Sequence, residues 1–196
     1  MSNLRGIITF QGFTESLSQS TGTERLFREV IRKFVGPDLT CLDPRQWDAD
    51  TDAMVGYLKR SGVTKCAVVG YSYGGGYTAQ KFAKACMRQG ITIKLMLLCD
   101  PVYRPTWLPA WGFLQPFAIR SLMPRSAVID IPRCVEEVHS VSQRLSLPMA
   151  HDLRNEWSMT KIHEPQVLPY GHTAIDESPE WFRLVKKHLT AFAASP

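Results

Sequence analysis

The sequence predicts an α/β fold in which a mostly parallel sheet is covered by helices on both faces. Short runs of nearly continuous apolar residues alternate with segments whose apolar residues recur at helical spacing, and the helical segments of the first half end at a glycine. Apolar runs of this kind are typical of parallel strands that helices bury on both sides. A chain of 196 residues, 44% of them hydrophobic, can bury a substantial core, so we expect residues 1–196 to form one domain.

The first half of the chain predicts a regular alternation. Strands are expected at residues 5–10, 38–43, 64–71 and 91–102, and helices at residues 23–36, 48–62 and 75–90. Thr23 or Thr21 is expected to cap the first helix, and acidic residues in the first turn of the second helix suit its dipole. The carboxyl ends of parallel strands meet at one edge of the sheet, which is therefore the expected place for a site.

After Pro101 this alternation ends. Residues 103–128 are rich in tryptophan, proline and phenylalanine, and we expect them to form a short cap over that edge, inserted after the fourth strand. Later elements are expected at residues 134–143 and 165–170, which resemble returning strands, and at residues 178–193, which resemble a closing helix. Ser178 and Pro179 suit the cap and the first position of this helix.

Composition and charge argue against several classes of protein. The net charge is +5, but Lys and Arg are scattered with no basic block longer than a pair, so we expect no nucleic-acid partner. Residues 107–124 form the most apolar region, yet their three prolines and Arg120 argue against an integral membrane span. The five cysteines show no C-x-x-C pair and no ligand spacing with histidine, so we expect neither disulfides nor a zinc site. With no signal peptide expected, we expect a cytoplasmic location, or export by a route other than a cleaved signal.

A glycine-rich junction between a strand and a helix carries the strongest motif. Residues 70–74 read G-x-S-x-G with Ser72 at the centre, and two more glycines follow. The glycine spacing does not fit the dinucleotide fingerprint G-x-G-x-x-G, and the Walker loop's G-K-[ST] is absent. In the nucleophile elbow, by contrast, a sharp strand-to-helix turn exposes a serine hydroxyl beside a helix N-terminus. We therefore predict that Ser72 is a nucleophile.

A serine nucleophile needs a base and an acid. His172 is the expected base, because it follows the last predicted strand and precedes the closing helix, within reach of the sheet edge. The other histidines are expected elsewhere: His188 on the helix surface, His139 in a structural role or on the polar face of the sheet, and His151 and His163 beside a loop whose structure the sequence leaves open. Asp100 ends an apolar strand and is the first candidate for the acid, while Asp152 and Asp130 stay open as alternatives.

The order Ser72, Asp100, His172 resembles that of the α/β-hydrolase superfamily, and the sequence GYSYGG is similar to the elbows of thioesterase-like and lipase-like members. The resemblance covers residues 5–193. It implies a compact α/β-hydrolase fold without the first two strands of the family. It also implies two backbone amides that hold an oxyanion, those of Tyr73 and Phe13, although Gln11 stands where relatives often carry a histidine.

The expected function is hydrolysis of an ester or thioester through an acyl-enzyme intermediate. The substrate would be a small molecule or an acyl-carrying ester or thioester, and neither a metal nor an organic cofactor is expected. Four aromatic residues are expected to bind it: Tyr71, Trp107, Trp111 and Phe113. The alternative for the aromatic residues of the cap is that they complete the core above the sheet. Two alternatives stay open, a hydrolase-fold binding or scaffold protein without catalysis and a nucleotide- or phosphate-binding α/β protein.

Overall fold

The computed structural model describes residues 4–13, 15, 21–103, 128–146, 148–156 and 159–195. In this part of the chain a sheet of seven strands forms the centre, in the order β2-β1-β3-β4-β6-β8 with β9 beside β6, and every pairing is parallel. Its strands are β1 (Leu4–Phe10), β2 (Leu39–Cys41), β3 (Val63–Tyr71), β4 (Thr92–Cys99), β6 (Glu137–Ser142), β8 (Lys161–Ile162) and β9 (Gln166–Val167). A second, two-stranded sheet pairs β5 (Ile129–Ile131) with β7 (Leu153–Asn155).

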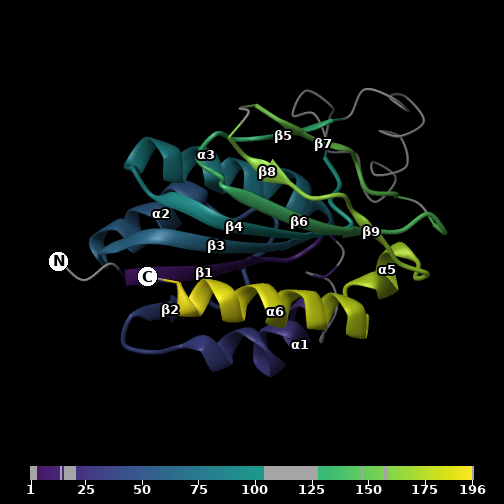
Figure 1. The fold of residues 1–196 in the computed structure, drawn as a ribbon, viewed down its shortest axis with the longest axis horizontal. Coiled ribbons are helices and arrows are strands. Elements are labelled where there is room, and N and C mark those ends of the chain that lie inside the picture. Colours follow the sequence, from purple (N-terminus) through teal and green to yellow (C-terminus); the bar gives the residue numbers. More distant parts are fainter. Residues whose placement is uncertain are drawn as a thin grey trace.

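Helices cover both faces of the sheet, as the sequence predicts (Figure 1). Helices α2 (Thr51–Arg60) and α3 (Ala79–Gln89) lie on one face, and α1 (Gly22–Glu29) and α6 (Pro179–Ala194) on the other. Each face has its own hydrophobic core, with Phe82 prominent in the first and Trp181 in the second, both fully buried. The short helix α5 (His172–Ile175) lies at the carboxyl end of the strands (Figure 1). In the described residues no helix has the length and apolar character needed to cross a membrane.

Local sequence explains where the helices begin and end. The Thr21 hydroxyl accepts a hydrogen bond from the amide of Glu24, so Thr21 rather than Thr23 caps α1. Asp50 caps α2 and Ser178 caps α6 in the same way. Helix α3 ends at Gly90, whose φ of 71° suits a residue without a side chain.

The structure differs from the sequence prediction mainly in the second half of the chain. The loop whose structure the sequence left open contains β7 and β8, β5 was not expected at all, and the strand expected at residues 165–170 is only β9. These strands are two or three residues long, too short for an alternating pattern to show. The predicted cap, residues 103–128, lies outside the described residues except at its two ends.

Candidate active site

Ser72 lies in the sharp turn that joins β3 to the following helical segment. It has a φ of 52°, a left-handed conformation that a residue with a side chain seldom adopts. The backbone crosses itself closely here, since a Cβ at Gly70 would lie 2.6 Å from the Cα of Gly75, and one at Gly74 would collide with the carbonyl oxygen of Gln11. A π-helical turn (Gly74–Thr78) then leads into α3. This is the strained strand-turn-helix geometry that the G-x-S-x-G spacing predicts.

The structure brings His172 to Ser72. The Ser72 Oγ and the His172 Nε2 lie 2.8 Å apart, although the residues are 100 positions apart in the sequence. Two contacts fix the backbone of His172: its amide donates to the Ser146 hydroxyl at 2.7 Å, and its carbonyl accepts from the Tyr71 hydroxyl at 2.7 Å. The Tyr71 ring also stacks on the imidazole, with 5.3 Å between centroids. In the described contacts Tyr71 therefore holds His172, and its expected role in binding substrate stays a prediction.

Asp100 completes a chain of three side chains. Its Oδ2 lies 2.5 Å from the His172 Nδ1, and the residue is fully buried directly after β4, with a φ of 44°. Three donors surround the carboxylate: the amide of Gln143 at 3.2 Å and that of Ala150 at 3.1 Å on Oδ1, and the Gln143 side-chain amide at 3.0 Å on Oδ2. These hydrogen bonds hold the carboxylate in place against the imidazole.

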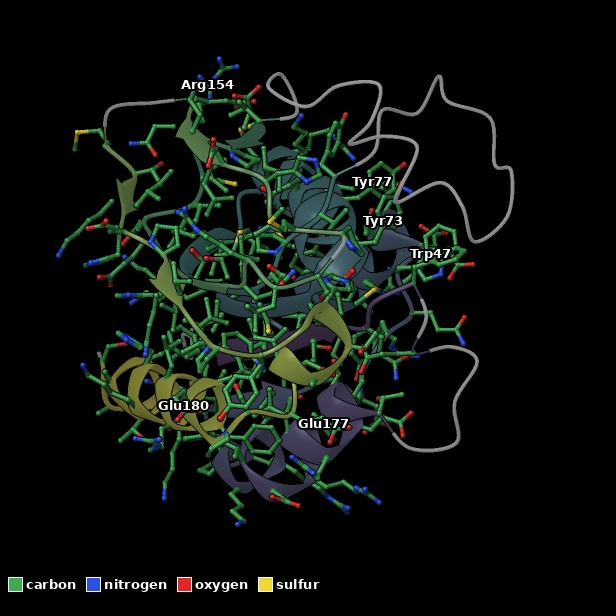
Figure 2. All side chains as sticks on the ribbon, turned by 90° about the vertical axis from the view of Figure 1, so that its right-hand side faces the viewer. Trp47, Tyr73, Tyr77, Arg154, Glu177 and Glu180 are labelled. Carbon is green, nitrogen blue, oxygen red and sulfur yellow. The ribbon has the colours of Figure 1, made fainter. Side chains whose placement is uncertain are left out.

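The two rival acids lie elsewhere. Asp152 is exposed, and Asp130 forms an ion pair with Arg154, with 2.7 Å between the Asp130 Oδ1 and the Arg154 Nε. In Figure 2, which faces the carboxyl ends of the strands, Arg154 lies at the outer margin of the molecule. Of the three carboxylates considered, the structure therefore places Asp100 against His172.

The loop after β1 lies beside the nucleophile, where an oxyanion site requires it. A Cβ at Gly12 would lie 3.1 Å from that of Ser72 and 2.8 Å from the Tyr71 ring. The amide of Gly12 donates to the Glu15 carboxylate at 2.7 Å. The amides of Phe13, directly after Gly12, and of Tyr73, directly after Ser72, stay the predicted oxyanion donors, and Tyr73 has a helical φ of −65°.

Behind this loop two carboxyl groups share a buried position. The Glu15 carboxylate also accepts from the Thr23 amide at 3.0 Å and from its hydroxyl at 2.8 Å. Burial, together with the charge of Glu15 and a hydrogen bond to it, raises the pKa of Asp176 to about 8. Because Asp176 lies four residues after His172, this pair joins the loop after β1 to the segment that carries the histidine.

Aromatic rings form a row beside Ser72, and the sequence pointed to only part of it. From one end to the other the rings are those of Phe13, Trp47, Tyr73, Tyr77 and Tyr103, with neighbouring centroids 5.1, 5.3, 4.9 and 6.4 Å apart. All are partly exposed, and Figure 2 shows Trp47, Tyr73 and Tyr77 in succession. Trp47 and Tyr77 were missed because neither belongs to a motif. Trp107, Trp111 and Phe113 lie outside the described residues.

Comparison with known proteins identifies the fold. No protein-family model matches the sequence, and no curated protein matches it. Among solved structures, the chain is similar to the RedJ thioesterase of prodiginine biosynthesis in Streptomyces coelicolor, with 14% identity over 95% of this chain and 85% of that one and a TM-score of 0.54. The SrfTE thioesterase domain, which cyclises the lipopeptide surfactin, has 11% identity over 98% and 92% and a TM-score of 0.54. The type II thioesterase BorB of the borrelidin cluster has 13% identity over 96% and 94% and a TM-score of 0.50. The chain therefore has the α/β-hydrolase-type fold found in thioesterases.

Proposed function

We propose that this protein is a serine hydrolase that cleaves esters or thioesters, with Ser72 as nucleophile, His172 as base and Asp100 as acid. The observation that carries the proposal is the continuous chain of contacts, 2.8 Å from Ser72 Oγ to His172 Nε2 and 2.5 Å from His172 Nδ1 to Asp100 Oδ2. A carboxylate can only accept a hydrogen bond, so the proton of a neutral His172 lies on Nδ1. Its Nε2 is then the acceptor for the serine proton.

In the proposed reaction the Ser72 oxygen attacks the acyl carbon while His172 takes the serine proton. The resulting imidazolium is stabilised by Asp100, and the amides of Phe13 and Tyr73 are proposed to hold the negative oxygen of the tetrahedral intermediate. Collapse of the intermediate breaks the bond to the alcohol or thiol, which leaves with the proton from His172. Water then enters the same cycle, and its attack releases the acid and restores Ser72.

We propose an acyl thioester or ester as the substrate class. The similar solved structures are described as thioesterases, which supports acyl-carrying substrates in general. The aromatic row supports this proposal, because partly exposed rings beside a nucleophile favour the binding of an apolar acyl group. We propose that Trp47 and Tyr77 contact the acyl group, with Tyr73 between them.

Labelling with a fluorophosphonate probe tests the proposal, because the probe reacts only with an activated serine. We expect one adduct by intact mass, mapped to Ser72 by peptide sequencing, and none in Ser72→Ala. Hydrolysis of p-nitrophenyl butyrate should fall by roughly 10⁴-fold or more in Ser72→Ala. Asp100→Asn should also lose roughly 10⁴-fold, because an amide in place of the carboxylate disfavours the required tautomer.

Asp152→Asn is the matched control, since it makes the same chemical change at the exposed rival carboxylate. It should retain the rate of the wild-type protein. A wild-type protein that forms no adduct would instead favour a binding or scaffold role for the fold. An unchanged hydrolysis rate in Ser72→Ala would exclude Ser72 as the nucleophile.

A further inference from the structure

Four residues outside the proposed active site gather on the face of the sheet that α6 covers. Glu137 and His139 are two positions apart in β6, so their side chains lie on the same face. His163 follows β8, which pairs in parallel with β6, and its amide donates to the carbonyl of Val138. His188 comes from α6, and its ring centroid lies 3.7 Å from that of His139.

Three of these side chains point polar atoms at one another. The His163 Nε2 lies 2.7 Å from the Glu137 Oε1, and the His139 Nε2 lies 3.2 Å from the same oxygen. One ligand atom of each residue lies within 4.8 Å of those of the other two. The ligand atoms of a tetrahedral zinc ion lie about 3.3 Å apart, given bonds of about 2.0–2.1 Å to nitrogen and oxygen. The separations of 2.7 and 3.2 Å from the Glu137 Oε1 are close to this spacing. The His139 and His163 rings are stacked, with centroids 3.9 Å apart, so they would have to rotate to point both Nε2 atoms at one ion.

We propose that Glu137, His139 and His163 form a binding site for a divalent transition-metal ion, for which zinc is the best fit. Two imidazoles and a carboxylate, without sulfur, are a ligand set that zinc accepts at three positions of its tetrahedron. His188 packs on the His139 ring and is placed to hold that ring in position. The sequence predicted no metal site, because these ligands lie in separate segments and have no motif spacing.

One ligand atom of the cluster lacks a well-formed hydrogen bond. The buried Nε2 of His139 has no hydrogen bond of acceptable geometry within the described part of the chain, although Glu137 is nearby. A buried imidazole nitrogen in this situation is a candidate ligand atom for an ion.

Binding of the ion would require two changes in the surrounding side chains. His163 now donates its Nε2 proton to Glu137, and with a metal on Nε2 the neutral ring carries that proton on Nδ1 instead. The Nζ of Lys161 lies 3.9 Å from the Glu137 Oε1, and this exposed side chain can move into solvent. An ion here would join β6 to the segment directly after β8.

Calorimetric titration of the chelator-treated protein with zinc chloride tests the proposal. We expect one zinc ion per chain, an affinity weakened at least about tenfold in both His163→Ala and Glu137→Gln, and a zinc-dependent rise in Tm that both variants lose. Glu137→Gln keeps the size of the side chain, so it separates the loss of a ligand from misfolding. His151→Ala is the matched control, because it removes a histidine whose Nδ1 accepts from the amide of Tyr103, and it should bind zinc like the wild-type protein.

Other outcomes would overturn the site. If the wild-type protein binds no zinc, the cluster is only a packed group of neutral side chains. If both ligand variants bind zinc as tightly as the wild-type protein, the ion occupies another place. Cobalt in place of zinc supplies a second readout, since an intense visible absorption band from a four-coordinate ion should appear in the wild-type protein and disappear in His163→Ala.

Discussion

At the scale of single residues, Gln143 organises the surroundings of the proposed acid. Its side-chain nitrogen donates to Asp100 and also to the carbonyls of Ser146 and Pro148, while its side-chain oxygen accepts from the amides of Leu145 and Ser146. The Ser146 hydroxyl in turn accepts from the amide of His172. One buried glutamine therefore fixes the position of Asp100 relative to the segment that carries the base.

Replacing Gln143 with Leu should lower kcat for ester hydrolysis about tenfold to 100-fold with little change in KM. A hydrogen bond to a charged group contributes about 1.5–3 kcal/mol, and each 1.4 kcal/mol in the activation barrier is about a factor of ten. Steady-state kinetics on folded protein measure the effect. Gln166→Leu, at an exposed position in β9, is the control. Equal rates in both variants would show that Gln143 does not position the acid.

At the scale of elements, the sequence predicts best where a long apolar strand ends in a polar residue. Ser72 and Asp100 directly follow β3 and β4, whose apolar runs are plain in the sequence, and His172 stands between the last strand and the last helix. Gln143, Glu15 and the histidine cluster had no such signal. Gln143 and Glu15 interact with partners that are distant in the sequence, Asp100 and Asp176, and the histidine cluster lies among strands too short to show a pattern. Their positions depend on tertiary packing, and contacts of this kind leave no regular pattern in a single sequence.

The pair of Glu15 and Asp176 makes stability depend on pH at the junction between the loop after β1 and α5. The pKa of Asp176 is raised from 3.8 to about 8, first by burial and then by Glu15, so the folded protein holds a proton that the unfolded chain releases above about pH 4. The contribution of this group to the free energy of unfolding is therefore highest below pH 4. It should fall as the pH rises toward 8, by up to about 1.4 kcal/mol per pH unit.

Asp176→Asn should remove this dependence, because an amide stays neutral at every pH. Urea unfolding at several pH values between about 4 and about 8 should show the variant gaining stability relative to the wild-type protein as the pH rises. Asp152→Asn, at an exposed carboxylate, should leave the pH profile unchanged. A constant difference in unfolding free energy between Asp176→Asn and the wild-type protein over this range would mean that Asp176 does not titrate there.

At the scale of the whole molecule, the proposed active site and the contact between the two chain termini lie at opposite edges of the sheet. The chain ends lie together at the amino end of the strands, while α5 lies at the carboxyl end (Figure 1). Arg5 in β1 joins the two ends, since its Nη1 donates to the carbonyls of Phe192, Ala193 and Ser195 at 3.2, 2.7 and 2.6 Å. These carbonyls lie at the C-terminal end of α6, which a cation stabilises, and that of Phe192 also accepts from the amide and the hydroxyl of Ser195.

Arg5→Met should therefore lower the free energy of unfolding by about 1–3 kcal/mol, because it leaves these carbonyls without their charged donor. It should leave kcat/KM for ester hydrolysis unchanged, since α6 and β1 hold the site through their packed cores and not through this contact. Urea unfolding and steady-state kinetics on the same sample measure the two effects. Lys81→Met makes the same change of charge on the exposed face of α3 and should alter neither quantity. A loss of activity in folded Arg5→Met would show that the joined chain ends influence the geometry of Ser72 and His172 across the length of the sheet.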